Sequence, residues 1–295
     1  MTESSDRWHR WLLNVRHGGD AGARERDLLD FLYPVRDKVL DGAQLRPEDT
    51  LLDVGAGDGL IAFGALDRLS PAGRVIFSDI SADLLDHCRQ VAEAEGLLDQ
   101  CRFVQAAADS LDGIPDESVD VVTTRSVLIY VKDKASAFRE FHRLLRPGGR
   151  ISLFEPINVL MGGYDLDSFC GYDIRPVALL AAKVGALYES IQPLGEDPMG
   201  DFDDRDLVRH AEDAGFPVVD LELRLTVKHT KQPVPWDRFL RTSGNPLIPP
   251  FGEAFDRTLS PDEIDEFTAH LRPLVESGTG QDRTALAYLT AAKAP

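Results

Sequence analysis

One carboxylate and three glycines stand at alternate positions between a short apolar run and the start of a helical pattern. They are Asp53, Gly55, Gly57 and Gly59. Glycine permits a positive φ and leaves room for a ligand to approach the backbone. A helix that begins after such a turn directs free N–H groups at whatever lies in the turn. The spacing therefore predicts a strand, a tight turn and a helix that bind a ligand, although some glycine-rich turns are only turns.

The same loop distinguishes two kinds of cofactor site. A dinucleotide fingerprint reads Gly-x-Gly-x-x-Gly, and Leu60 occupies the place of its last glycine. The acid two residues before the first glycine instead gives Asp-x-Gly-x-Gly-x-Gly, which resembles the S-adenosylmethionine (SAM) loop of class I methyltransferases. This resemblance implies that Asp53 and the backbone from Gly55 to Leu60, including Ala56, face the amino-acid end of SAM.

A second buried-strand pattern, Arg74–Asp79, ends in a carboxylate. A carboxylate at the end of the second strand accepts hydrogen bonds from ribose hydroxyls, so we expect Asp79 to bind the ribose, with Ile80 beside it. The alternative is that Asp79 is only an acid near a helix N-terminus. Ser81 is equally suited to cap that helix.

The third strand pattern, 101–105, runs into three alanines and Asp109. Class I methyltransferases usually have Gly-Asp-Ala here, and the acid reaches the adenine amino group. In this chain Ala107 takes the place of the acid and Ala108 supplies backbone, so the resemblance leaves Asp109 as the substitute for the adenine contact.

A fourth apolar strand pattern ends in a polar cluster that contains Arg125, Ser126 and Tyr130. In the family this strand end lines the methyl-transfer site, so we count Arg125 and Ser126 among the SAM-binding residues. An amphipathic helix at 137–145, ended by Arg-Pro-Gly-Gly at 146–149, precedes a strand at 150–155. This series is typical of class I methyltransferases, which residues 48–156 resemble throughout.

The alternation of strands and helices predicts an α/β fold with a doubly wound, mainly parallel sheet. The resemblance implies seven strands, with strand six at 218–230 and strand seven at 284–293. We expect an N-terminal helical cap at 1–47 and a SAM-dependent methyltransferase domain at 48–295. Two insertions interrupt that domain, one after strand five (156–202) and one between strands six and seven (231–283). Both insertions are expected to form a lid and the acceptor region.

The cap contains Trp8, Trp11 and Arg16. Family members often cover SAM with an N-terminal helix, and a guanidinium matches a carboxylate geometrically. Arg16 is therefore a candidate for the SAM carboxylate, and the alternative is a surface arginine beside packed tryptophans.

Methyl transfer depends on holding nucleophile, methyl group and sulfur in line. A neutral amine needs little more, whereas a hydroxyl or a carbon acid needs a general base. The candidates at the pocket mouth are Tyr130, Glu155, Tyr164 and His229. The structural alternatives are packing under the cofactor for Tyr130, a strand cap for Glu155 and an exposed strand position for His229.

The 295 residues carry a net charge of −18, which repels nucleic-acid backbones and anionic membranes. We therefore expect a small-molecule or peptide acceptor, with no nucleic acid and no membrane. The three cysteines are scattered and indicate no disulfide framework, and no metal-ligand cluster is recognisable, so no metal is expected. The N-terminus lacks a signal-peptide pattern, which predicts a cytoplasmic protein.

The leading function is a SAM-dependent methyltransferase acting on an N-, O- or C-nucleophile. An arginine-rich composition is typical of GC-rich bacteria, in which many such enzymes tailor natural products. The alternatives are an NAD(P)-linked oxidoreductase, which Leu60 and the Arg-Pro-Gly-Gly series disfavour, and a non-catalytic SAM-binding protein. If the added segments do not form a lid, they are expected to form a homodimer interface.

Overall fold

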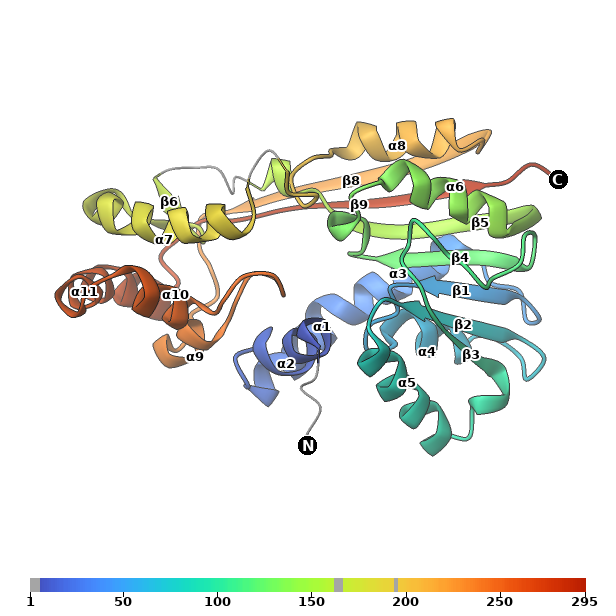
Figure 1. The fold of residues 1–295 in the computed structure, drawn as a ribbon, viewed down its shortest axis with the longest axis horizontal. Coiled ribbons are helices and arrows are strands. Elements are labelled where there is room, and N and C mark those ends of the chain that lie inside the picture. Colours follow the sequence, from blue (N-terminus) through green and yellow to red (C-terminus); the bar gives the residue numbers. More distant parts are fainter. Residues whose placement is uncertain (1–5, 162–166, 194–195) are drawn as a thin grey trace.

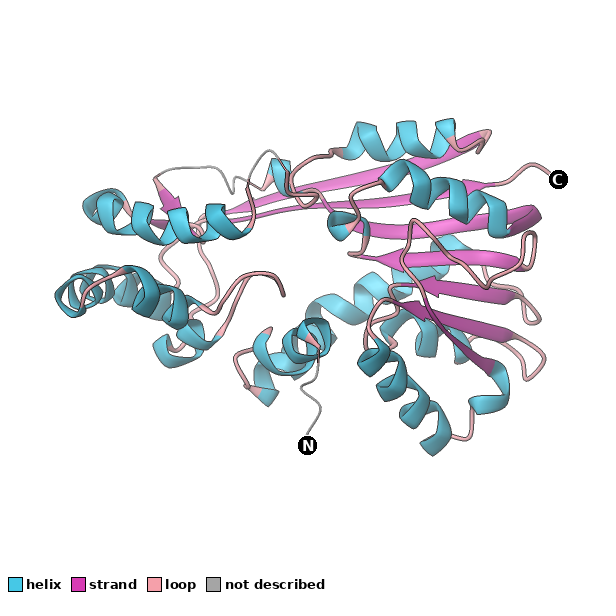
Figure 2. Cartoon of the chain, viewed as in Figure 1, coloured by secondary structure: helices cyan, strands magenta, loops and turns pink. Residues whose placement is uncertain are grey.

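A seven-stranded sheet forms the centre of the computed structural model, which describes residues 6–161, 167–193 and 196–295 (Figures 1 and 2). The strand order is β3-β2-β1-β4-β5-β9-β8. The strands are β1 (Thr50–Val54), β2 (Arg74–Asp79), β3 (Cys101–Gln105), β4 (Val119–Arg125), β5 (Leu145–Pro156), β8 (Val218–Lys228) and β9 (Asp282–Ala292). The first five pair in parallel, and β9 lies antiparallel between β5 and β8. This confirms the doubly wound, mainly parallel sheet predicted from the sequence.

Helices cover both faces of the sheet because its central strands are apolar on both sides. Leu51 packs on one face with α3 (Tyr33–Ala43), α4 (Leu60–Leu66) and α5 (Ala82–Ala94). Leu52 packs on the other face with α6 (Lys134–Leu144) and α8 (Asp204–Asp213). Successive strand residues point to opposite faces, so adjacent leucines enter two separate cores. Short 3-10 turns lie at Leu98–Gln100, Leu128–Tyr130 and Asn158–Leu160, and another, Arg175–Val177, precedes α7 (Ala178–Ile191) of the first insertion.

The N-terminal segment is helical from Arg7 onward. It comprises α1 (Arg7–Arg10), a π-helical turn at Trp11–Val15, α2 (Ala21–Asp27), a second π-helical turn at Leu28–Leu32, and α3. Residues 16–19 form a turn between the first π-helical turn and α2. Figure 1 shows α1 and α2 beside the strand ends where β1 and β2 meet α4 and α5.

The two insertions pack together into one helical unit. The first contributes the small strands β6 (Ser168–Phe169) and β7 (Tyr172–Asp173) and the helix α7 (Ala178–Ile191). The second contributes α9 (Trp236–Arg241), α10 (Phe251–Thr258) and α11 (Pro261–Ser277). Their buried side chains form a third core of their own. The long strands β8 and β9 lead to this unit, which lies to the side of the sheet in Figure 1.

One element boundary differs from the sequence prediction. We expected Arg-Pro-Gly-Gly at 146–149 to separate a helix from a strand that begins at Arg150. In the structure Leu145 already pairs with Val119, and β5 starts there. A register shift follows before Arg150 pairs with Val121, so the segment is an irregularity within β5. Gly148, at φ +73°, accommodates it.

No helix among the described residues is long and apolar enough to cross a membrane.

Candidate active site

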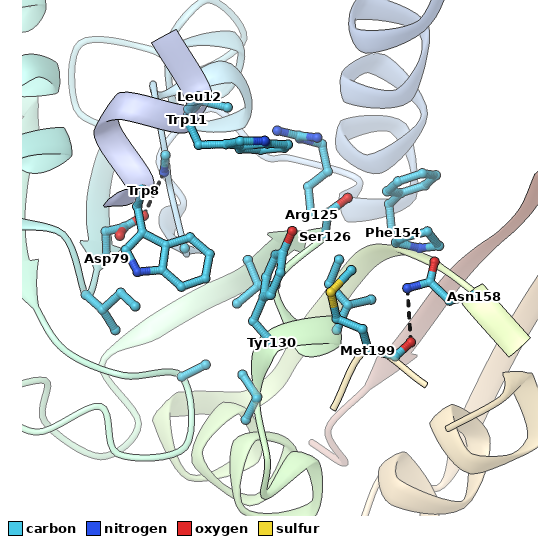
Figure 3. A pocket seen from close by; sticks show the side chains of 18 of the residues that line it. Trp8, Trp11, Leu12, Asp79, Arg125, Ser126, Tyr130, Phe154, Asn158 and Met199 are labelled. Carbon is cyan, nitrogen blue, oxygen red and sulfur yellow. Dashed lines mark hydrogen bonds between the residues drawn. The ribbon is translucent and has the colours of Figure 1, made fainter. Parts of the chain in front are cut away.

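A cavity of about 730 Å³ lies at the carboxyl ends of the parallel strands (Figure 3). Such volumes are within the usual range for small-molecule sites. One part is lined from the sheet and its loops by Gly55, Gly57, Asp79, Ile80, Leu84, Ala106, Ala107, Ala108, Asp109, Arg125, Ser126, Val127, Ile129, Tyr130, Val131 and Lys132. The lining also includes residues of the N-terminal segment, of β5 and β9 and of the two insertions: Trp8, Trp11, Leu12, Arg16, Phe31, Phe154, Pro156, Asn158, Met161, Met199, Ser243, Gly244, Thr284 and Leu286.

Asp79 joins the glycine loop to the start of α5. One carboxylate oxygen accepts the Gly57 N–H at 2.9 Å, and the other accepts the Ser81 N–H at 2.9 Å. Burial raises the pKa of Asp79, and these backbone hydrogen bonds oppose the shift. A carboxylate can accept about four hydrogen bonds, so capacity remains on the side that lines the cavity. Ser81 caps α5 by accepting the Leu84 N–H, which the sequence left as one of two possible caps.

The three glycines of the loop serve different needs. Each has a positive φ, +66° at Gly55, +59° at Gly57 and +85° at Gly59. A Cβ at Gly55 would lie 2.2 Å from Val127, and one at Gly59 would lie 2.4 Å from Phe63. These two positions are therefore fixed by packing. A Cβ at Gly57 would come within 3.3 Å of Leu12 in the N-terminal helical segment, beside the cavity.

Asp53 lies behind the loop instead of on the cavity wall. One of its oxygens accepts the Thr123 hydroxyl at 2.9 Å, and the other has no hydrogen-bond partner among the described residues. Burial raises the pKa of Asp53 to about 7. Its neighbours in the predicted set, Ala56, Gly59 and Leu60, are also absent from the lining. The sequence pattern located the loop, but did not reveal which of its side chains reach the cavity.

The predicted adenine region does line the cavity. Ala107, Ala108 and Asp109 follow β3 there, and Ile80 is 48% exposed beside them. An apolar side chain exposed toward a cavity offers a surface for a flat ring. The adenine contact proposed for Asp109 stays a prediction.

Arg16 lines the cavity but already has a partner. Its guanidinium lies 3.1 Å from the Asp27 carboxylate and 5.6 Å from the centre of the Trp11 ring. Arg125 lines the same cavity from the end of β4 and extends toward Trp11 (Figure 3).

Among the four candidates for a catalytic group, Tyr130 lines the cavity. Its ring packs edge-on against Trp8, with the ring centres 4.9 Å apart. Burial and the nearby Glu155 raise the pKa of Tyr130, so its phenol keeps its proton at neutral pH. The hydroxyl is therefore suited to donate a hydrogen bond and unsuited to act as a base.

The other candidates lie elsewhere. Glu155 is fully buried and accepts the backbone N–H groups of Val127, Leu128 and Ile129 at 2.9, 2.9 and 3.3 Å. Burial raises its pKa to about 7. Glu155 therefore fixes the turn that carries Tyr130, and its carboxylate does not line the cavity. His229 is exposed beyond the end of β8 and is not in the lining. Tyr164 lies outside the described residues.

Local sequence patterns missed much of the cavity wall. Phe31, Phe154, Met199, Ser243 and Leu286 come from segments that meet only in the folded chain. A longer-range contact fixes part of this wall, because the Asn158 side-chain amide donates to the Met199 carbonyl at 3.0 Å (Figure 3). Ser126 also has a strained backbone at the site, with φ +54°. No contiguous sequence motif indicates any of these features. Within the described ranges, no group of three or more His, Cys, Asp or Glu side chains is placed to hold a metal ion.

The fold agrees with that of the proteins to which this chain is similar. A family model described as a methyltransferase domain matches residues 52–153. The ubiquinone/menaquinone biosynthesis C-methyltransferase UbiE of Hahella chejuensis is 33% identical over 182 residues, which cover 60% of this chain and 71% of that protein. The tRNA 5-carboxymethoxyuridine methyltransferase of Escherichia coli is 35% identical over 124 residues, or 42% of this chain and 46% of that protein.

Among solved structures, a phosphoethanolamine N-methyltransferase of Haemonchus contortus in complex with SAM has a TM-score of 0.52 and 16% sequence identity. The match covers 89% of this chain and 53% of that one.

Proposed function

The chain belongs to the class I SAM-dependent methyltransferases, and we propose that it methylates a small, largely apolar acceptor in the cavity beside Tyr130. The observation that carries the proposal is the continuity of the cavity. It runs from the Asp79 carboxylate past the end of β4 to an apolar wall that includes Phe31, Phe154 and Met199. A methyl donor and an apolar acceptor can therefore share one cavity.

The residues around Asp79 fit SAM. Asp79 has acceptor capacity left for a ribose diol, and Ile80 and Asp109 border the space for adenine. Gly57 keeps the wall open where a larger residue would press on Leu12. When bound, SAM supplies a methyl group that is already activated on its sulfonium. The task left to the protein is to position the acceptor and exclude water.

The lining as a whole suits an acceptor that needs little help from a base. The ionisable side chains in the lining are Arg16, Asp79, Asp109, Arg125, Tyr130 and Lys132. Asp79 is already committed to backbone hydrogen bonds, and the Tyr130 phenol stays protonated. We infer that Tyr130 orients the acceptor by a hydrogen bond or by packing. An amine, or an acceptor that binds already ionised, fits this set better than an unactivated alcohol.

A small molecule is favoured over nucleic acid by charge and by enclosure. The chain carries a net charge of −18, which opposes a polyanionic substrate. Part of the wall comes from the N-terminal helices and from the insertions, which narrow the space left for an acceptor. In the test below, tRNA therefore serves as the acceptor that should not be methylated.

The test combines binding with turnover. Calorimetry should show that S-adenosylhomocysteine and SAM bind with one site per chain and that NAD does not bind. Methyl-labelled SAM should then transfer label to members of a panel of apolar amines, phenols, quinols and carboxylic acids, and not to bulk tRNA. Binding of NAD in place of SAM, or label in tRNA alone, would reject the proposal. SAM binding without transfer to any acceptor class would favour a non-catalytic SAM-binding protein.

A further inference from the structure

Arg125 is a cavity-facing arginine without a partner. It is the last residue of β4 and lines the cavity wall. Within residues 6–161, 167–193 and 196–295, its guanidinium makes no hydrogen bond or ion pair that fixes it. Figure 3 shows the side chain extending across the cavity toward Trp11. A guanidinium offers five N–H donors in a planar fork, and here that fork faces the space where the ligand would bind.

The neighbouring acids do not neutralise Arg125 directly. Glu155 accepts three backbone N–H groups on the far side of the turn. One oxygen of Asp53 accepts the Thr123 hydroxyl. Asp58 lies 3.9 Å from Arg24. Burial and the nearby Arg16 lower the pKa of Arg125, and these three carboxylates oppose that shift through space.

Arg125 therefore differs from the other arginine of the cavity. Arg16 is paired with Asp27, whose carboxylate also lies 3.7 Å from His17. Removing a cation from water without a partner is costly, so an enclosed but unpaired guanidinium indicates that an anionic ligand completes the site. Arginine and a carboxylate form the most favourable such pair, through two parallel hydrogen bonds.

Strand register places Arg125 close to the glycine loop. Val54 pairs with Thr124 across β1 and β4, so Arg125 is level with Gly55. If Asp79 binds the ribose, the methionine part of SAM passes over these two strand ends on its way to the apolar half of the cavity. A group bound to Arg125 would thus lie at the junction between the SAM half and the acceptor half.

We propose that Arg125 binds a carboxylate at this junction of the cavity. The inference rests on the proposed function and refines it. Two molecules could supply this carboxylate: SAM, through its methionine part, or an acceptor that is itself an apolar acid. In either case Arg125, and not the already paired Arg16, is the residue that recognises it.

The first experiment tests whether Arg125 binds the carboxylate of SAM. Calorimetry compares S-adenosylhomocysteine with its decarboxylated analogue, S-adenosyl-3-thiopropylamine, on the wild type, Arg125→Gln, Arg16→Gln and Arg139→Gln. Arg139 lies on the exposed surface of α6 and serves as the matched control. If the carboxylate belongs to SAM, Arg125→Gln should lose at least tenfold in affinity for S-adenosylhomocysteine and bind both compounds equally. Arg16→Gln and Arg139→Gln should keep the preference for the carboxylate.

The second experiment addresses the acceptor. The protein, with and without S-adenosylhomocysteine, is titrated with 2-naphthoic acid and with 2-naphthamide. If the acceptor supplies the carboxylate, the acid should bind more tightly than the amide, and Arg125→Gln should abolish the difference. Should Arg125→Gln fail to fold, Arg125→Lys keeps the charge but not the planar fork, and it should show a weaker form of the same losses.

The outcomes are distinct. If neither carboxylate preference depends on Arg125, the inference is overturned. If the wild type binds neither S-adenosylhomocysteine nor its analogue, the proposed function fails, and the naphthoic acid titration still decides whether Arg125 binds a carboxylate.

Discussion

At the scale of single residues, the position of Asp79 is compatible with both roles that the sequence presented as alternatives. It holds the Gly57 and Ser81 N–H groups, and it lines the cavity where a ribose would bind. A motif could reveal it because the strand, the acid and the helix cap are contiguous in sequence. Asp53 belongs to an equally clear motif but lies behind the loop, because its side chain points to Thr123 on the neighbouring strand.

Replacing Asp79 by Asn should weaken binding of S-adenosylhomocysteine at least tenfold, or by about 1.4 kcal/mol. An amide has one acceptor oxygen, so it cannot accept both backbone N–H groups and the ribose hydroxyls. Calorimetry measures the effect, and Asp86→Asn on the exposed part of α5 is the control. A dissociation constant equal to that of the wild type, with normal thermal unfolding, would exclude the ribose role.

Glu155 should make stability depend on pH. Burial raises its folded pKa from 4.5 to about 7, so between these values the folded protein keeps a proton that the unfolded chain has lost. Protonated Glu155 therefore contributes its full stabilisation to the free energy of unfolding below pH 4.5. This contribution declines as pH rises toward 7, by at most about 1.4 kcal/mol per pH unit.

Glu155→Gln removes this titration, although it also costs one of the acceptors for the backbone N–H groups of 127–129. Urea unfolding at pH 5 and pH 7 should show a smaller fall in stability for the variant than for the wild type. An identical fall in both proteins would contradict the raised pKa.

At the scale of elements, the N-terminal segment contacts α9 and the loop that follows it through hydrogen bonds and an ion pair between residues far apart in the sequence. The Arg241 guanidinium donates to the Gly18 carbonyl at 3.0 Å, and the Trp11 indole donates to the Ser243 carbonyl at 3.3 Å. Arg238 lies 3.3 Å from the Asp20 carboxylate. The cap and the second insertion therefore meet over the cavity. These segments are more than 200 positions apart in the sequence, so no local sequence pattern could indicate the contact.

Two adjacent glycines test this contact. Gly18 and Gly19 both have a positive φ, so alanine strains each backbone similarly. A Cβ at Gly18 would lie 2.9 Å from the Arg238 carbonyl oxygen, whereas a Cβ at Gly19 would meet nothing within 4 Å. Gly18→Ala should therefore speed amide hydrogen exchange in residues 7–20 and weaken S-adenosylhomocysteine binding more than Gly19→Ala does. Equal behaviour of the two variants would show that the contact does not hold the cap.

Lys134 fixes the start of α6 to the chain that returns from the first insertion. Its buried ammonium donates to the Val131 and Pro198 carbonyls at 3.0 Å each and to Asp201 at 2.5 Å. Lys134→Met leaves these acceptors without their donor and should cost about 2–3 kcal/mol in the free energy of unfolding. Lys183→Met, which breaks an exposed pair with Glu263, should cost less than about 1 kcal/mol. Chemical denaturation compares the two, and similar losses would mean that Lys134 has no special structural role.

The strands themselves were predictable because each central strand is a short apolar run between turn residues. β2 and β3 begin and end where the sequence indicated. The start of β5 was wrong by five residues, since pairing with β4 continues through the Arg-Pro-Gly-Gly segment despite its turn-forming residues.

At the scale of the whole molecule, the sheet, the N-terminal cap and the insertions each supply part of the cavity wall. The sheet ends supply the Gly55, Gly57 and Asp79 side, while the cap and the insertions supply Trp8, Met199 and Ser243. The sequence predicted that these added segments lie near the acceptor, since only they were left to enclose it. It did not predict that the two insertions share one aromatic core, because Tyr172 and Phe239 come from segments on either side of β8.

The central claim is that this cavity binds SAM with the ribose on Asp79. A crystal structure of the protein with S-adenosylhomocysteine tests it most directly. The account predicts both ribose hydroxyls within hydrogen-bond distance of the Asp79 carboxylate, the adenine beside Ile80 and Asp109, and the sulfur directed toward the apolar half of the cavity. A ligand that lies elsewhere, or whose ribose makes no contact with Asp79, would contradict the account.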